Sequence, residues 1–112
     1  MTPRILVVDD DEGVRYTLRG VLEDEGYEVE EAVDGEEALA RIDEGFHLVL
    51  TDLRMPRRDG LSLLRALRDR PQPPRVVLLT ALGSARAAVE AMKHGAYDYF
   101  KQPFETDELL AV

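Results

Sequence analysis

The sequence contains no cysteine, which excludes disulfide bonds, thiolate metal ligands and thiol nucleophiles. It also contains no apolar run near the roughly 20 residues that a membrane-spanning helix requires. Residues 1–4 lead directly into an apolar segment, without the layout of a signal peptide. We therefore expect a cytoplasmic protein that makes no membrane contact and whose chemistry depends on carboxylates, hydroxyl groups and two histidines.

Positive charge is scarce as well, because 14 lysine and arginine side chains stand against 23 aspartates and glutamates, for a net charge of −9. This balance argues against direct contact of the domain with a nucleic acid. The acids are concentrated in residues 1–52, which carry 16 acidic and only 4 basic side chains. With 112 residues, of which 45% are hydrophobic and 33% charged, the chain has the size and composition of one globular domain.

Short apolar runs alternate with longer segments of helical spacing. This pattern is typical of a doubly wound α/β fold, in which helices cover both faces of a parallel sheet. The expected five strands are residues 5–8, 28–32, 48–51, 76–80 and 97–100. Polar and apolar side chains alternate in the second strand, so we place it at an edge of the sheet. For the strand order we assume 2-1-3-4-5, the common winding of flavodoxin-like folds.

Apolar side chains at helical spacing predict a helix after each strand. The expected helices cover residues 14–22, 36–44 and 61–67, and the segment between Ser84 and Gly95. Gly26 and Gly45 provide C-terminal stops for the first two. A fifth helix begins at Thr106 and reaches Val112, which is shorter than an average helix of about 10 to 14 residues. We therefore interpret residues 1–112 as one domain with a truncated fifth helix.

Acidic side chains gather where two expected strands end. Asp9, Asp10 and Asp11 follow the first strand, and Asp52 follows the third. In the assumed order these strands are neighbours, about 4.8 Å apart, so Asp9 or Asp10 approaches Asp52 at the edge where open α/β sheets bind ligands. Crowded carboxylates repel each other unless a cation neutralises them, and Mg²⁺ prefers such oxygen ligands. The alternative is that the acids cap the following helix. One acid is expected to do so, but four acids exceed what capping requires, which favours a Mg²⁺ site.

Four blocks along the chain resemble the receiver domain of bacterial two-component response regulators. The blocks are residues 6–11 (LVVDDD), 51–60 (TDLRMPRRDG), 79–81 (LTA) and 95–104 (GAYDYFKQPF). The resemblance extends over essentially the whole chain. Residues 88–92 (AVEAM), followed by the last block, look most like the nitrogen-regulator class, whose members activate transcription with sigma-54 polymerase. The resemblance implies a flavodoxin-like receiver fold and a signalling switch that turns over no metabolite.

The resemblance assigns roles to the acids. It implies that Asp52 accepts a phosphoryl group from a histidine kinase, in a reaction that the domain itself catalyses. It further implies that Asp10, Asp52 and the backbone carbonyl of Arg54 bind Mg²⁺, with Asp9 holding the ion through water. The chemistry agrees, because a carboxylate nucleophile needs little activation and a divalent ion neutralises charge on the transferring oxygens. The structural alternative for Asp52 is an acid that caps the turn before Pro56.

Thr80 and Tyr99 match the switch residues of the family, in which the threonine bonds a phosphoryl oxygen and the aromatic ring then moves inward. Without the resemblance, strand packing is the preferred explanation of Thr80, and an amphipathic ring at the sheet rim explains Tyr99 as well as a switch does. The chain departs from the family after the fifth strand, because the expected lysine before Pro103 is Gln102, and Lys101 comes one residue early. Glutamine brings no charge. Lys101 is expected to point away from the acids, as an ordinary surface lysine does.

Two other functions stay open. A phosphohydrolase with an aspartate nucleophile would need a second acid two residues after Asp52, where the sequence has Arg54. A receiver that works without phosphorylation, as a binding or homodimerisation module, is favoured by Gln102 and disfavoured by the intact Asp10 and Asp52. We therefore favour the phosphorylation-dependent switch, with a histidine kinase and an output domain for transcription regulation as its partners.

Overall fold

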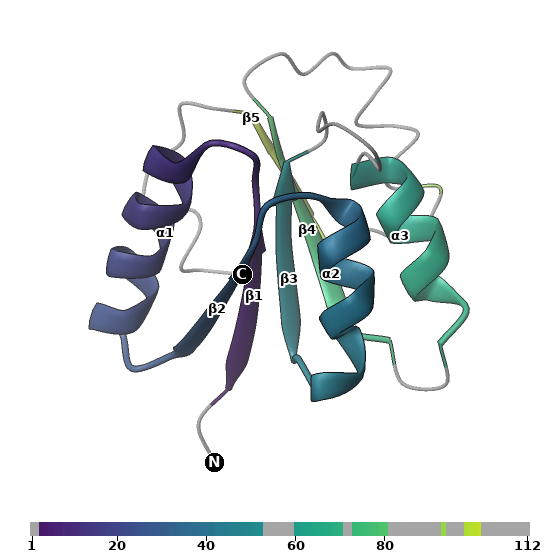
Figure 1. Cartoon of the computed structure of the whole chain (residues 1–112), viewed down its shortest axis with the longest axis horizontal. Helices are drawn as coiled ribbons and strands as arrows, with labels where there is room; N and C mark the ends of the chain where they lie inside the picture. The colour runs from purple at the N-terminus through teal and green to yellow at the C-terminus, as the bar shows by residue number, and fades with distance from the viewer. Residues whose placement is uncertain (1–2, 53–59, 71–72, 81–92, 94–97, 102–112) are drawn as a thin grey trace.

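The computed structural model describes residues 3–52, 60–70, 73–80, 93 and 98–101. Within these ranges, five parallel strands form one sheet in the order β2-β1-β3-β4-β5 (Figure 1). The strands are β1 Arg4–Val8, β2 Glu28–Ala32, β3 Leu48–Asp52, β4 Arg75–Thr80 and β5 Asp98–Lys101. The assumed winding and the edge position of the second strand are therefore confirmed.

Helices cover both faces of the sheet, as the sequence pattern predicts (Figure 1). The helix α1 (Glu12–Asp24) lies on one face, and α2 (Gly35–Arg41) and α3 (Gly60–Arg68) lie on the other. The segments expected to form the fourth and fifth helices lie outside the described residues, apart from residue 93, which is helical. Within the described ranges, no helix has the length and apolar character needed to cross a membrane.

The strand β1 is buried on both faces, which explains its continuous apolar sequence. Because successive strand side chains point to opposite faces, Ile5 and Val7 pack with Leu18 of α1. Leu6 and Val8 pack on the other face with apolar side chains of α2 and α3. This two-sided packing fixes the end of β1, the point at which the first acids begin.

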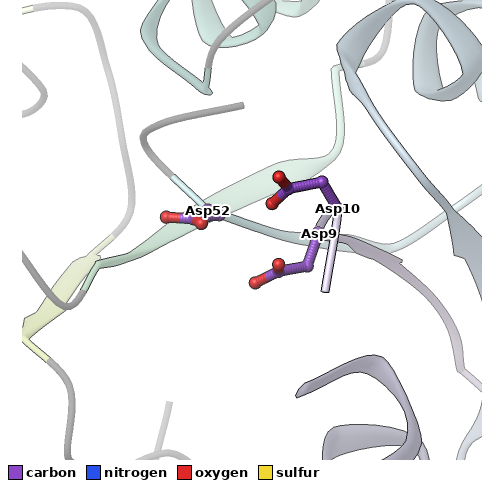
Figure 2. A group of neighbouring side chains, drawn as sticks. All are labelled: Asp9, Asp10 and Asp52. Atoms are coloured by element: carbon purple, nitrogen blue, oxygen red, sulfur yellow. The ribbon is translucent and has the colours of Figure 1, made fainter. Parts of the chain in front are cut away.

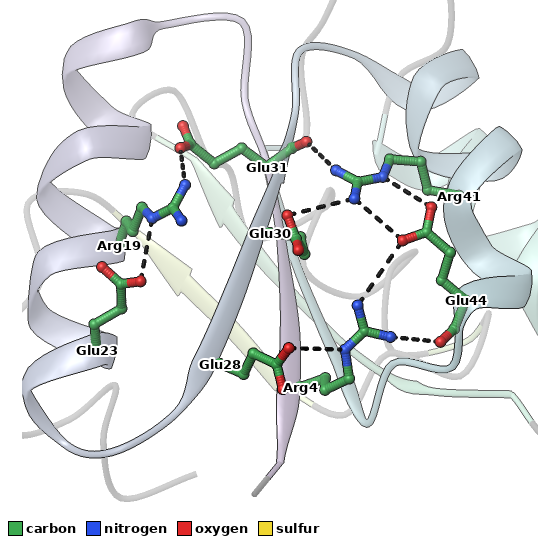
Figure 3. Close-up of polar contacts among 8 residues, drawn as sticks. All are labelled: Arg4, Arg19, Glu23, Glu28, Glu30, Glu31, Arg41 and Glu44. Carbon is green, nitrogen blue, oxygen red and sulfur yellow. Dashed lines mark hydrogen bonds and ion pairs between the residues drawn. The ribbon is translucent and has the colours of Figure 1, made fainter.

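The strand β2 forms an edge of the sheet, and its glutamate side chains pair with arginines (Figure 3). Val29 and Ala32 are buried, whereas the other three residues are glutamates with exposed or half-exposed side chains. We call Glu28, Glu30 and Glu31 the glutamate edge. Arginines from three neighbouring elements pair with it, in the ion pairs Arg4–Glu28 at 3.7 Å, Arg41–Glu30 at 3.4 Å and Arg19–Glu31 at 2.7 Å.

Several element boundaries differ from the sequence prediction. The strands β1, β3 and β4 each include one residue more than expected, Arg4, Asp52 and Arg75 respectively, and α1 extends two residues further at both ends. The helix expected over residues 36–44 ends as an α-helix at Arg41, and Ile42–Glu44 form a 3₁₀ helix. Gly45 closes this tighter turn at φ 86°, a left-handed conformation that favours glycine. The fifth strand continues through Lys101, one residue beyond its expected end, because its pairing with β4 reaches Thr80, and its expected first residue, 97, lies outside the described residues.

Candidate metal centre

Three carboxylates lie together at the carboxyl edge of the sheet, where β1 and β3 end (Figure 2). Val8 and Thr51 are register partners, so the residues that follow them start side by side. Asp9, Asp10 and Asp52 each offer one carboxylate oxygen within 4.8 Å of the other two. The side chains come from neighbouring strand ends, as the order 2-1-3-4-5 requires. We call these three residues the acid cluster.

The acid cluster is buried on one side and open on the other. Asp9 is buried, with only 4% of its surface exposed, whereas Asp52 is half-buried and Asp10 is exposed. A ligand that arrives from solvent therefore meets Asp10 and Asp52, and Asp9 forms the inner wall.

The electrostatics of the acid cluster favour a bound cation. Burial, together with the neighbouring charges of Asp52 and Asp10, raises the pKa of the Asp9 carboxyl from 3.8 to about 6. A 2.9 Å hydrogen bond from the backbone N–H of Asp11 opposes this rise in pKa. Ionisation of Asp9 is therefore unfavourable next to the charged Asp10 and Asp52. A bound divalent ion would relieve this repulsion among the three carboxylates.

The chemistry of the donor set fits Mg²⁺. All three donors are carboxylate oxygens, and the part of the chain that the structure describes contains no second group of this kind. Mg²⁺ prefers oxygen ligands and is commonly bound by one or two carboxylates together with water. Arg54, whose carbonyl completes the ligand set that the resemblance implies, lies outside the described residues.

The turn that carries the first acids is held by backbone hydrogen bonds. The N–H of Asp9 donates to the carbonyl of Ala32 in β2 at 3.1 Å. Oδ1 of Asp11 accepts from the N–H groups of Gly13 at 2.8 Å and Val14 at 3.2 Å, which caps α1. The prediction that one acid caps the first helix is therefore confirmed, and this acid is Asp11. Asp9 and Asp10 contribute their carboxylates to the acid cluster.

Arg15 contacts the same turn, although the sequence did not single it out. Its Nη1 donates to the carbonyl of Asp9 at 2.7 Å, and its Nε donates to Glu31 at 3.0 Å. The sequence offers one weak signal, because Arg15 follows the capping Asp11 by one helical turn. The contact with Glu31 depends on how β2 aligns with β1, which local sequence does not specify.

The remaining predicted site residues belong to β4 and β5 or follow them. Thr80 is the last residue of β4 and follows the register partner of Asp52. Tyr99 and Lys101 belong to β5, and Lys101 is the register partner of Thr80. The backbones of Thr80 and Lys101 thus reach the same edge of the sheet as the acid cluster. Gln102 lies outside the described residues.

A separate cavity of about 680 Å³ lies at the opposite, amino end of the strands. Its lining includes His47, which precedes β3, and Arg75, which begins β4. It also includes the ion pair of Arg70 with Asp43. Open α/β sheets bind ligands at the carboxyl ends of their strands, and none of the predicted site residues within the described ranges lines this cavity. The acid cluster is therefore the candidate site.

Known proteins resemble this chain along nearly its whole length. The family described as response regulator receiver domain matches residues 5–112. The chain is 44% identical over 108 residues to the transcriptional regulatory protein CpxR of Escherichia coli (strain K12). That match covers 96% of this chain but 46% of CpxR. The chain thus spans about half the length of the curated relatives it matches.

Solved structures show the same similarity in three dimensions. The chemotaxis protein CheY4 of Vibrio cholerae superposes with a TM-score of 0.92 at 32% identity, over 99% of this chain and 95% of that chain. The receiver domain of NtrX from Brucella abortus gives a TM-score of 0.88 at 38% identity, over 96% of this chain and 92% of that chain. NtrX fits the expected nitrogen-regulator class. Response regulators such as CpxR and MprA are at least as similar in sequence, so membership of the nitrogen-regulator class stays a prediction.

Proposed function

Because this chain belongs to the response regulator receiver domain family, we propose that it is a switch whose Asp52 accepts a phosphoryl group from a histidine kinase. Receiver domains are phosphoacceptor switches and not enzymes in the usual sense. Relatives such as CpxR are transcriptional regulators about twice as long as this chain. We therefore expect phosphorylation of Asp52 to control an output domain that regulates transcription.

The convergence of Asp52 with Asp9 and Asp10, within 4.8 Å, is the observation that supports this proposal. An oxygen of Asp52 attacks the phosphorus of the phosphorylated kinase histidine. The new P–O bond forms as the P–N bond breaks, and the released imidazole takes up a proton from solvent. Most of the catalysis comes from positioning, which the rigid ends of β1 and β3 supply.

The acid cluster and the carbonyl of Arg54 would hold Mg²⁺ next to the nucleophile. When bound, the ion neutralises charge on the transferring phosphoryl oxygens. Asp9 has to give up its proton to contribute its full charge, and its pKa is raised to about 6. Affinity for the cation therefore decreases as the pH falls below neutral.

Thr80 and Tyr99 are the residues that we propose to carry the signal away from Asp52. Thr80 lies one residue beyond the register partner of Asp52, so its backbone is close to the end of β3. Its hydroxyl would donate to a phosphoryl oxygen, which biases a two-state equilibrium that includes Tyr99. Gln102 can donate a hydrogen bond but supplies no charge, and Lys101 lies within β5.

The decisive test is incubation with Mg²⁺ and acetyl phosphate, followed by measurement of the intact mass. We expect the wild type to gain one phosphoryl group and Asp52→Asn to gain none. Asp69→Asn is the matched control, because Asp69 is an exposed aspartate outside the acid cluster and should leave the reaction unchanged. Equal modification of Asp52→Asn, or normal modification in EDTA, would contradict the assignment.

A second function, a binding module that dimerises without phosphorylation, is supported by the glutamine at position 102. Sedimentation of the wild type and Gln102→Lys, each with and without acetyl phosphate, distinguishes the phosphorylation-dependent switch from the constitutive binding module. A switch changes its self-association when it is phosphorylated, whereas a constitutive module sediments identically in every condition. A response seen only in Gln102→Lys would show that the missing ammonium limits signalling.

A further inference from the structure

We infer that Arg15 is a positioning residue for the acid cluster and acts through the backbone of Asp9. The inference rests on the proposed function, because it concerns how the cluster is kept ready for a cation beside Asp52. Arg15 is the fourth residue of α1 and contacts the turn that the first acids form.

The guanidinium of Arg15 joins two elements through different nitrogens. Nη1 donates to the carbonyl of Asp9 at 2.7 Å, and Nε donates to Oε1 of Glu31 at 3.0 Å. The Arg15 side chain is only 13% exposed, so these contacts are shielded from solvent more than a surface ion pair is. A planar guanidinium suits such a bridge because its donors are fixed relative to one another.

Glu31 is itself fixed on both sides, so it is a firm anchor for Arg15. Its Oε2 accepts from Nη1 of Arg19 at 2.7 Å (Figure 3). Its backbone carbonyl accepts from Nη1 of Arg41 in α2 at 3.0 Å. The hydrogen bonds from Arg19 and Arg15 lower the pKa of Glu31 below its ordinary value. Glu31 is therefore ionised at neutral pH.

The acid cluster needs such support because its own charges oppose its geometry. Three carboxylates with oxygens within 4.8 Å repel each other, and the strand pairing of β1 ends at Val8. Beyond Val8, the N–H of Asp9 is bonded to Ala32, and its carbonyl is bonded to Arg15. Arg15 therefore fixes the peptide that joins Asp9 to Asp10, and with it the direction in which Asp10 leaves the strand.

Loss of Arg15 should weaken cation binding more than it changes the chemistry at Asp52. Residues that orient metal ligands typically change metal affinity by about 10 to 100-fold when they are mutated. We expect Arg15→Met to raise the Mg²⁺ dissociation constant by about tenfold. At saturating Mg²⁺ the rate of phosphorylation by acetyl phosphate should stay close to that of the wild type, because the bound ion restores the geometry.

Calorimetric titration with Mg²⁺ at fixed pH and ionic strength measures this directly, without any reaction. Arg15→Lys keeps a positive charge but loses the planar fork, so it should bind Mg²⁺ nearly as weakly as Arg15→Met. Arg4→Met is the matched control, because Arg4 also pairs with a glutamate of β2 but contacts Glu28, at the amino end of the strand, and not Glu31. Arg4→Met should keep the wild-type affinity.

An unchanged Mg²⁺ affinity in Arg15→Met would overturn the inference. An equal loss in Arg4→Met would overturn it too, because the effect would then reflect general loosening around β2. Where Arg15→Met fails to fold by circular dichroism, Arg15→Lys and Glu31→Gln provide the test. Failure of the proposed function is a separate result, in which the wild type binds Mg²⁺ but Asp52 gains no phosphoryl group.

Discussion

The backbone N–H of Asp11 donates a 2.9 Å hydrogen bond to Oδ1 of Asp9, within a turn that begins a helix and ends a strand. Asp11 also caps α1, so one residue supports both the helix and the inner acid. The hydrogen bond does not cancel the effects of burial and of the neighbouring acids, and the pKa of Asp9 stays raised at about 6. The ionisation of Asp9 is therefore linked to the folding of the domain.

The raised pKa of Asp9 predicts that the unfolding free energy in EDTA falls as the pH rises from about 4 to about 6. In this window the folded protein keeps a proton that the unfolded chain has lost, so alkalinisation favours unfolding. Above the window, the penalty reaches about 2 to 3 kcal/mol. Asp9→Asn removes it, and urea unfolding at pH 8 should show the variant to be more stable by about 2 kcal/mol.

The control for this pH effect is Asp69→Asn, which removes an exposed charge outside the acid cluster. Its unfolding free energy should follow the wild type at every pH. The difference between Asp9→Asn and the wild type should vanish below about pH 4, where both states of Asp9 are protonated. A constant difference across the pH range would contradict the link to Asp9.

Mg²⁺ is predicted to stabilise the folded domain through the acid cluster. A ligand that binds only the folded state adds about 2.7 kcal/mol to the unfolding free energy at 100 times its dissociation constant. Asp10→Asn removes a charged donor from the exposed side of the cluster, so it should lose most of this gain. Thermal unfolding in MgCl₂, compared with NaCl of equal ionic strength, measures the effect. Equal stabilisation of the wild type and Asp10→Asn would argue for binding elsewhere.

Asp34 is predicted to be a strong helix cap. Asp34 is only 1% exposed, and its side chain accepts a 2.9 Å hydrogen bond from the N–H of Glu37 in the first turn of α2. Asp34→Ala should lower the unfolding free energy by about 1 to 2 kcal/mol in urea unfolding, whereas Asp34→Asn should lose less because its oxygen still caps the helix. If Asp34→Asn lowers the unfolding free energy as much as Asp34→Ala does, helix capping is not the cause of the loss.

Leu6 is predicted to be among the most sensitive core positions. It lies in β1, is fully buried and packs on the face that α2 and α3 cover. Leu6→Ala leaves a cavity and should lower the unfolding free energy by about 3 to 5 kcal/mol. Tyr16→Ala on α1 is the control, because Tyr16 is 79% exposed and should change the stability little. Similar losses in both variants would contradict this account of the core.

The sequence predicts most of the fold because its strands carry distinct patterns. The apolar run in β1 follows from burial on both faces, and the glutamates of β2 mark it as an edge strand, although its buried residues Val29 and Ala32 pack on opposite faces of the sheet. The acid cluster could also be predicted, since Asp9, Asp10 and Asp52 come directly at or after strand ends. Element ends are less certain, as the 3₁₀ turn Ile42–Glu44 and the extra pairing of Lys101 show.

The bridge from Arg15 to Glu31 could not be predicted in the same way. Sixteen residues separate the two positions, and their contact requires both the pairing of β2 with β1 and the packing of α1. Arginines and glutamates are also common on exposed helix and strand surfaces. The sequence therefore indicates where such side chains are, but only the register shows which of them reaches the carbonyl of Asp9.

The glutamate edge affects the tendency of the domain to aggregate at high concentration. An open sheet margin is a template on which another chain can add a strand and start a fibril. Here an added strand would meet three carboxylates paired with arginines of α1, α2 and β1, and the backbone carbonyl of Glu31 already accepts a hydrogen bond from Arg41. We expect this margin to resist amyloid-like stacking, so that the domain stays dispersed in a crowded cell.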